Sequence, residues 1–287
     1  MKIKKNQRLS DYTTIGVGGP VPVVYLPNSE TELVELLQIL STEKRPYRVL
    51  GNGSNILADD RGLREAIVCT KQLERIVRIV ENSVTVDAGY PVAQLAYQIA
   101  SKGLSGLEFA VGIPGSIGGV VRMNAGAHQH TVSEVVHSVR IIMPDARVVV
   151  ASNQDLDFTY RSCAVPKDAI ITEVNLLLQK GNPKEIHELT RKYNEQRTST
   201  QPLKEKSAGC IFKNPGECSA GKLIEDAGLK GYQIGGARVS ELHANFIVNH
   251  GHASFGDVLQ LMDHIKNVVF QNQGVRLQEE VMIWRYE

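Results

Sequence analysis

The chain has 287 residues, of which 42% are hydrophobic and 22% charged. This composition is typical of a soluble globular protein with two or three compact units. The 32 basic and 31 acidic residues leave a net charge of +1, which excludes a global field that would recruit nucleic acid or an anionic membrane. No run of 18 apolar residues and no signal-peptide pattern occurs. We therefore expect a cytoplasmic protein with a small ligand, no nucleic-acid partner and no membrane insertion.

Hydrophobic spacing predicts an α+β organisation. A helix over 29–44 begins with a possible capping box at Ser29 and precedes a strand over 47–50. Pro91 is expected at the first helical position of a helix over 92–102, which Gly103 ends. Further strands are predicted at 66–70, 84–88, 137–143, 147–151 and 169–178, and further helices at 183–196, 219–227 and 254–271.

Two features of the second half concern its organisation. Residues 196–206, QRTSTQPLKEK, are almost free of apolar side chains and are predicted to be a linker, with a domain boundary near residue 200. Residues 274–284, GVRLQEEVMIW, are predicted to be one strand with alternating faces. That alternation places Glu279 and Glu280 on opposite faces and does not decide which of them has a functional role.

Two glycine-rich loops are candidates for binding phosphate. LGNGSN follows the predicted strand 47–50, and GIPGSIGG at 112–119 leads into VRMNAGA at 121–127. Glycines allow backbone N–H groups to approach an anion closely. Neither loop has the dinucleotide fingerprint G-x-G-x-x-G, and no G-K-[ST] occurs. Two such loops about 60 residues apart favour a long cofactor with a pyrophosphate, and FAD is the leading candidate.

The cysteines are spaced too irregularly for a disulfide framework or a zinc site. Reduced thiols are therefore expected, and the H-x-H pairs at 128–130 and 250–252 lack the further ligands of a metal site. Cys210 stands out because it lies in SAGCIFKNP, close to Lys213 and Asn214. From the residues alone it is a packing residue, a nucleophile, a metal ligand or a proton donor.

Seven motifs together resemble the UDP-N-acetylenolpyruvylglucosamine reductase family, also called UDP-N-acetylmuramate dehydrogenase. They occur in the family's order over nearly the whole chain: LGNGSN, GIPGSIGG with NAGA, FTYRS, SAGCIFKNP, IEDAGLKG, HANFIVN and LQEEV. The short segment between Arg161 and Gln196 resembles the subclass that lacks a tyrosine-bearing substrate loop. Thr200 stands where the family often has a basic residue, which leaves one expected diphosphate contact in doubt.

The resemblance implies a vanillyl-alcohol-oxidase-type FAD-binding fold in two subdomains, 1–69 with a terminal strand 279–287 and 70–200. A C-terminal α+β substrate domain would span 201–278. It also implies non-covalent FAD, NADPH as co-substrate and reduction of UDP-N-acetylglucosamine-enolpyruvate to UDP-N-acetylmuramate for peptidoglycan. A monomer is expected.

The resemblance also implies roles for individual residues. Arg161 and Glu280, rather than Glu279, would polarise the substrate carboxylate, and Cys210 would donate a proton at a position that is commonly serine. Substrate contacts are expected from Tyr160, Lys213, Asn214 and His243, with Asn245 in the same HANFIVN segment near the nucleotide. FAD contacts are expected from Leu50, Gly51, Asn52, Gly53, Ser54, Asn55, Gly112, Ile113, Pro114, Gly115, Ser116, Gly118, Gly119, Asn124, Ala125 and Gly126.

Cys210 suits proton donation, because an unperturbed thiol with a pKa of about 8.5 is mostly protonated at neutral pH. Nucleophilic catalysis would need a neighbour that lowers this pKa. His243 is one candidate for that neighbour, so a cysteine-dependent hydrolase or transferase is the first rival hypothesis. A non-catalytic sensor of nucleotide-sugars with the same fold is the second.

Overall fold

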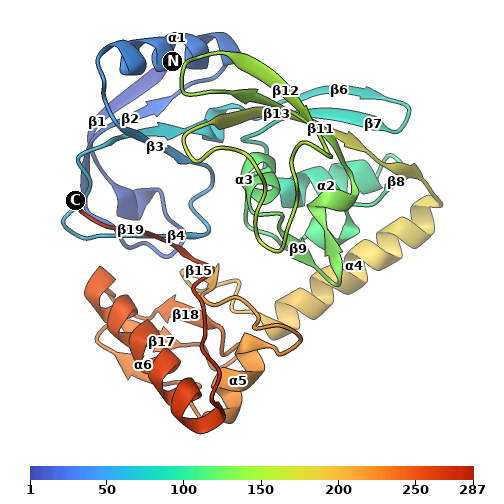
Figure 1. The fold of residues 1–287 in the computed structure, drawn as a ribbon. Coiled ribbons are helices and arrows are strands. Elements are labelled where there is room, and N and C mark those ends of the chain that lie inside the picture. Colours follow the sequence, from blue (N-terminus) through green and yellow to red (C-terminus); the bar gives the residue numbers. More distant parts are fainter. The chain divides into compact units, whose positions relative to one another are not determined.

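A computed structural model describes the backbone of residues 1–287 and every side chain except that of Val77. The chain forms two compact units (Figure 1). The first unit comprises Met1–Lys5, Val23–Asn52 and Glu65–Arg197, and the second comprises Asn6–Pro22, Gly53–Arg64 and Thr198–Glu287. The three-part division at residues 69/70 and 200/201 stays a prediction. Within the described part of the chain, no helix has the length and apolar character needed to cross a membrane.

A four-stranded sheet has the order β1-β2-β5-β3, and β1 (Lys2–Arg8) and β2 (Pro20–Leu26) both cross the division between the units. In the first unit, β5 (Ala66–Cys69) runs parallel to β2 and to β3 (Tyr47–Leu50). Helix α1 (Glu30–Thr42) buries four leucines against these strands. The predicted helix and strand are confirmed. Ser29 caps the helix as expected, but the Glu32 carboxylate accepts from the Asn28 N–H, so the capping box is incomplete.

The larger sheet of the first unit has the order β12-β11-β13-β7-β6, with all neighbours antiparallel. One face packs on the core that includes α2 (Val92–Ala100) and α3 (Ile117–Arg122). The predicted strands are confirmed within one residue at each end. Their bounds are β7 (Ser83–Asp87), β11 (Val136–Ile142), β12 (Val148–Ser152) and β13 (Ile170–Leu177), whereas the edge strand β6 (Ile76–Val80) was not predicted.

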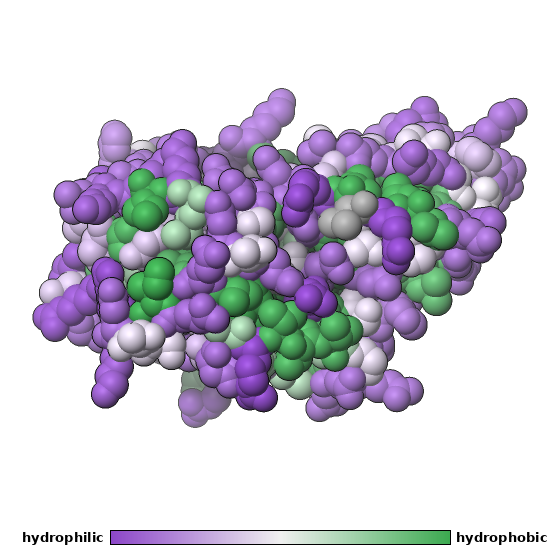
Figure 2. All heavy atoms as spheres, turned by 90° about the horizontal axis from the view of Figure 1, so that it is seen from above, coloured by the Kyte–Doolittle hydropathy of each residue, from purple (hydrophilic) through white to green (hydrophobic). Residues whose placement is uncertain are grey.

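The edge strands of this sheet expose Val80, Val148 and Val150. In the view from above (Figure 2), apolar side chains appear as separate groups among hydrophilic ones. Short elements complete the unit: β8 (Leu104–Ser105), β9 (Gly126–Ala127), β10 (His130–Thr131), β14 (Gln179–Lys180) and three 3-10 helices, η2 (Thr70–Gln72), η3 (Glu108–Ala110) and η4 (Val132–Glu134).

Two predicted helix boundaries are corrected. Pro91 is the N-cap of α2 and not its first helical residue, because its ψ of 118° is extended. Helix α4 (Pro183–Thr200) continues into the segment predicted to be a linker. That segment is polar because most of the helix surface is exposed, and glutamine and arginine are good helix formers. Pro202, two residues beyond the helix end, is the actual breaker.

The second unit contains an antiparallel sheet of order β15-β18-β17-β16. Helices α5 (Ala220–Asp226) and α6 (Phe255–Gln273) pack on its core, which also includes Ile15, Val17 and Leu57. Both helices and the strand after Asn245 are confirmed. The remaining bounds are β15 (Ser207–Cys210), β16 (Gln233–Ile234), β17 (Ala237–Val239), β18 (Phe246–Asn249) and η1 (Leu9–Asp11).

The prediction of one strand over 274–284 is wrong. Only β19 (Met282–Trp284) is a strand, and it pairs in parallel with β4 (Ile56–Ala58). Before it, Glu279 forms an isolated bridge with Phe212. The alternation of burial breaks at its end, since Trp284 is buried although Gln278 and Met282, on the same predicted face, are exposed. The chain changes partner along this segment, so one pleat does not extend through it.

Candidate functional site

The first half of the LGNGSN loop contacts the second glycine-rich loop within the first unit. Leu50 is buried at the end of β3. A Cβ atom at Gly51 would lie 2.7 Å from the Ser116 hydroxyl oxygen, so any larger residue there would force this hydroxyl to move. The Asn52 side-chain amide donates to the Pro114 carbonyl. The two loops predicted to bind one cofactor are therefore in contact through these residues.

Two glycines of the 112–119 loop have packing roles inside the protein. A side chain at Gly112 would collide with the aliphatic part of Arg197, and a Cβ at Gly118 would lie 2.7 Å from the Ala88 methyl. The N–H groups of Ile117 and Gly118 donate to the carbonyls of Tyr90 and Ala88. Close packing of α3 therefore explains part of the glycine content that the sequence attributed to a ligand.

Ser116 is the position at which this loop fits a polar ligand. Its side chain is 2% exposed, and its hydroxyl oxygen has no hydrogen-bond partner among the described residues. A buried hydroxyl without a partner costs free energy unless a ligand or water satisfies it. It lies beside Gly51, where no side chain intervenes. The residues present thus suit a phosphate or other polar group of FAD.

Arg161 lies in a tight turn of the first unit. Thr159 and Ser162 exchange two backbone hydrogen bonds, of 3.1 and 3.2 Å, across this turn. Arg161 has a φ of +59°, in the left-handed region that favours glycine or asparagine. Its guanidinium lies 5.0 Å from the ring of the exposed Tyr160. A strained arginine held at a turn is a candidate functional residue.

Asn124, predicted to bind FAD, uses its side chain inside the protein. Its amide nitrogen donates to the Thr159 carbonyl at 3.0 Å, and its oxygen accepts from the Ser133 N–H at 3.3 Å. It is 7% exposed. Asn124 therefore connects the glycine-rich segment to the turn that carries Arg161.

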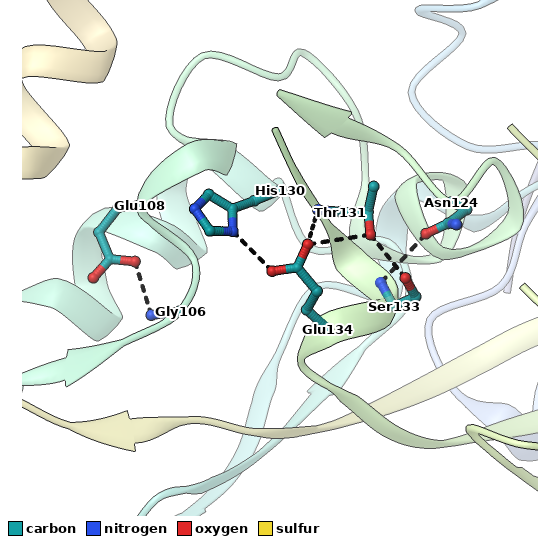
Figure 3. A network of polar contacts seen from close by, with 7 residues as sticks. All are labelled: Gly106, Glu108, Asn124, His130, Thr131, Ser133 and Glu134. Atoms are coloured by element: carbon teal, nitrogen blue, oxygen red, sulfur yellow. Dashed lines mark hydrogen bonds and ion pairs between the residues drawn. The ribbon is translucent and has the colours of Figure 1, made fainter. Parts of the chain in front are cut away.

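A polar network stabilises the loop after Asn124 (Figure 3). Thr131 and Glu134 form a capping box, and His130 lies 2.8 Å from the Glu134 carboxylate. Burial opposes the ionisation of Glu134, but the bonds from His130 and Thr131 outweigh it and hold its pKa below the usual value. In the same view, the Glu108 carboxylate accepts from the Gly106 N–H at 2.8 Å. The network fixes the backbone of this loop.

The second half of the LGNGSN loop is fixed within the second unit. The Thr14 N–H donates to the Gly53 carbonyl, and its hydroxyl donates to the Ser207 carbonyl at 2.6 Å. The Asn55 amide donates to the Glu280 carbonyl at 3.2 Å. Thr14 is a connecting residue that the sequence analysis did not assign, and a threonine in a TTIG run gives no specific signal for this role.

The backbone segments that carry Cys210 and Glu280 are hydrogen-bonded to each other in the second unit. Cys210 ends β15 opposite Phe246, and Glu280 donates its N–H to the carbonyl of Ile211 at 2.8 Å. A Cβ at Gly209 would lie 3.7 Å from the Ser54 carbonyl oxygen. Part of the predicted cofactor loop and the backbone segments that carry Cys210 and Glu280 are thus neighbours. Arg161 belongs to the first unit.

Geometry separates the two adjacent glutamates. The Glu279 carboxylate forms an ion pair with the Lys266 ammonium at 2.9 Å. Glu280 is the residue after the one that bridges to Phe212, and it is half-buried. The choice of Glu280 remains a prediction, and the ion pair gives Glu279 a structural role.

Two of the predicted substrate residues of the second unit, Asn214 and His243, lie at the start of α5. The Asn214 side-chain oxygen accepts from the Ala220 N–H at 3.0 Å, and Lys213 donates its N–H to the Gln278 carbonyl. The His243 ring contacts the Phe246 ring edge-on, and its Nδ1 accepts from the Asn245 N–H at 3.3 Å. This places His243 next to the residue that pairs with Cys210.

Comparisons with known proteins agree with this geometry. Residues 21–152 match an FAD-binding domain family, and residues 201–284 match the C-terminal domain of UDP-N-acetylenolpyruvoylglucosamine reductase. The reductase of Anoxybacillus flavithermus is 41% identical over 98% of this chain and 94% of its own. That of Bacillus subtilis is 39% identical with the same coverage. A Thermus caldophilus reductase structure has a TM-score of 0.86 at 36% identity and 99% coverage of both chains.

The fold and these matches define an FAD-binding oxidoreductase with a separate C-terminal domain. The expected vanillyl-alcohol-oxidase-type class is confirmed. The chain belongs to the UDP-N-acetylenolpyruvoylglucosamine reductase family.

Proposed function

We propose that this protein reduces the enolpyruvyl ether of UDP-N-acetylglucosamine-enolpyruvate to UDP-N-acetylmuramate at the expense of NADPH. Family membership over 98% of the chain carries this proposal. When bound, FAD supplies a ring that accepts a hydride from NADPH and passes it to the substrate. One NADPH and one proton are consumed for each ether reduced.

The reaction defines what the side chains must do. A hydride added to the methylene carbon leaves negative charge at the neighbouring carbon, next to the substrate carboxylate. We propose that Arg161 and Glu280 stabilise this charge through the carboxylate and that the Cys210 thiol protonates the carbon. The backbone hydrogen bond from Glu280 to Ile211, the residue after Cys210, supports this assignment for the second unit. The thiolate would regain its proton from solvent.

The cofactor would be held by the loops 50–55 and 112–119, with the Ser116 hydroxyl as one donor. The Gly51–Ser116 approach and the partnerless hydroxyl support this. Lys213, Asn214, Tyr160 and His243 are proposed to contact the nucleotide-sugar.

The first test is spectroscopic. Purified protein should be yellow, and it should oxidise NADPH steadily only when the enolpyruvyl substrate is present. A protein that binds UDP-sugars without oxidising NADPH would support the sensor hypothesis instead. Turnover of an ester without flavin, blocked by thiol alkylation, would support a cysteine hydrolase.

The second test separates the two half-reactions by anaerobic stopped-flow spectroscopy. Cys210→Ala should keep flavin reduction by NADPH but slow reoxidation by substrate roughly 10²- to 10⁴-fold, the range for loss of a general acid. Cys210→Ser should keep part of the rate. Cys218→Ala, which removes an exposed thiol of the same unit, is the matched control. Equal losses in both half-reactions would contradict the proton-donor role.

We further propose that the protein acts as a monomer in the cytoplasm. Light scattering coupled to size-exclusion chromatography should give the mass of one chain, about 31.6 kDa, and a doubled mass would contradict this.

A further inference from the structure

The segment 211–213, which follows Cys210, is hydrogen-bonded on both sides although it lies outside any strand. Gly209, with a φ of +74°, precedes Cys210, and the pairing register of β15 shifts between Ser207 and Cys210. Regular pairing with β18 therefore ends at Cys210. Residues 211–213 must be fixed by other contacts if the thiol is to keep one position.

One side of this segment is fixed by the chain around Glu280. Glu280 donates its N–H to the Ile211 carbonyl, and Lys213 donates to the Gln278 carbonyl, both at 2.8 Å. Phe212 and Glu279 form an isolated antiparallel bridge. Displacement of 211–213 would therefore move Cys210 and Glu280 together.

The other side is bonded to Asn245. Its backbone carbonyl accepts from the Ile211 N–H at 2.9 Å. Its side-chain oxygen accepts from the Phe212 N–H at 2.9 Å, and its side-chain nitrogen donates to the Phe212 carbonyl at 2.8 Å. The amide thus offers Phe212 the acceptor and donor that a neighbouring strand's backbone would offer. Asn245 is 3% exposed and Phe212 is 1% exposed.

We propose that Asn245 is the positioning residue of this catalytic segment, and that it holds Cys210 and Glu280 in place through Phe212 without contacting substrate. This inference rests on the proposed function. The resemblance placed Asn245 near the nucleotide, but both of its amide groups are engaged with Phe212. A displacement of about 1 Å at a catalytic group can cost about 10²-fold in rate.

The matched control is Asn249. It is the last residue of β18, whereas Asn245 directly precedes the first residue of this strand. Its side chain also joins separate segments of the second unit, by donating to the Ile15 carbonyl at 3.0 Å and accepting from the Ala253 N–H at 2.9 Å. Asn249→Ala removes a comparable set of bonds at the far end of the strand. A loss that merely reflects weaker folding should therefore affect both variants.

The first experiment measures both half-reactions of Asn245→Ala, Asn249→Ala and the unaltered enzyme at temperatures well below unfolding. For Asn245→Ala we expect NADPH-driven flavin reduction within about twofold of the unaltered enzyme and substrate-driven reoxidation slowed about 10²-fold. The D₂O solvent isotope effect on reoxidation should rise, because proton transfer becomes slower. Asn249→Ala should keep both rates.

Asn245→Asp gives a second readout. A protonated aspartic acid has the same shape as asparagine and can both accept from and donate to Phe212, whereas the carboxylate loses the donor and faces the Phe212 carbonyl. Burial should raise the pKa of the new carboxyl above its usual value of about 3.9. Reoxidation relative to the unaltered enzyme should therefore recover at about pH 5 and fall at least about tenfold by pH 8. Because Cys210, His243 and Glu280 are ionisable and present in both proteins, each rate is compared with that of the unaltered enzyme at the same pH.

The outcomes are distinct. Reoxidation at the unaltered rate in Asn245→Ala, or an equal loss in Asn249→Ala, would overturn the positioning role, as would a pH-independent Asn245→Asp ratio. If the unaltered enzyme itself shows no substrate-driven reoxidation, the proposed function fails, and Asn245 is not the cause.

Discussion

Arg161 combines an unfavourable backbone conformation with a proposed catalytic role. Its φ of +59° costs a residue with a Cβ about 1–2 kcal/mol, and glycine avoids this cost. Arg161→Gly and Arg161→Ala both remove the guanidinium, but only glycine relieves the strain. We predict that the glycine variant is more stable than the alanine variant by about 1 kcal/mol, in chemical denaturation.

Both Arg161 variants should reduce flavin normally and lose most reoxidation by substrate. A restored rate in the more stable glycine variant would show that the turn conformation matters and the guanidinium does not. Equal stability of the two variants would remove the argument that strain is retained for function.

Asp59 should make stability depend on pH. Its buried carboxylate accepts from the Arg61 side chain and from the N–H groups of Arg61 and Tyr286. The Arg61 side chain is the main cause that lowers its pKa, against burial, well below the usual range. The stabilisation is present above the unfolded pKa of about 3.9 and is lost as pH falls towards the lower folded value.

Asp59→Asn should therefore lower the free energy of unfolding by about 1–2 kcal/mol at pH 7. The difference from the unaltered protein should shrink below about pH 4. Asp145→Asn, at an exposed carboxylate paired with Arg147, is the control and should change little. Denaturant titrations at several pH values measure these free energies of unfolding. A difference between Asp59→Asn and the unaltered protein that widens towards low pH would contradict the prediction.

At this scale, the sequence identified residues by type and by motif, but it could not assign their contacts. Cys210 was recognised from SAGCIFKNP, and the structure supplies its neighbours. Asn124 was expected to contact the cofactor, yet its side-chain amide donates to the Thr159 carbonyl, 35 residues further along the chain, in the turn that carries Arg161. A side-chain amide can bond in any direction, so its partner follows only from tertiary structure.

Among the elements, the start of α6 offers a direct measure of capping. The Ser254 hydroxyl accepts from the Asp257 N–H, and the Asp257 carboxylate accepts from the Ser254 N–H and the Gly236 N–H. Ser254→Ala should cost about 1 kcal/mol or more of the free energy of unfolding. Ser219→Ala at α5 removes a cap without the reciprocal bond and should cost less. Thermal and chemical unfolding of both variants test the order.

Helices and strands with strong local patterns could be predicted, because four leucines on one face or a run of β-branched residues is sufficient. Two segments could not. The end of α4 resembled a linker because an exposed polar helix and a polar loop have the same composition. The 274–284 segment changes partner from Phe212 to β4, and no sequence period records such a change.

For the whole molecule, FAD should raise the melting temperature. A ligand at 100 times its Kd adds about 2.7 kcal/mol, or several degrees for a chain of this size. Gly51→Ala forces the Ser116 hydroxyl to move and should reduce this shift. Gly256→Ala, in the first turn of α6, should not, because a Cβ there would meet only the Ser254 hydroxyl at an ordinary contact distance of 3.7 Å. The measurement is the melting temperature of each variant without flavin and after reconstitution with FAD. If FAD raises the melting temperature of Gly51→Ala as much as that of the unaltered protein, the assigned cofactor loop is contradicted.

The fold class could be predicted from the order of seven motifs, since that order carries information about the entire chain. Which stretches of the chain form each of the two units could not be predicted. Each unit is assembled from three separate stretches, and the LGNGSN loop is divided between them at Asn52 and Gly53.

This interleaving limits how the gene can be cut. A fragment that starts at residue 198 would keep the sheet and both helices of the second unit but would lack Ile15, Val17 and Leu57, which complete its core. Such a truncation would expose apolar surface and aggregate. Recombination could exchange the second unit between homologues only by transferring three non-adjacent gene segments at once.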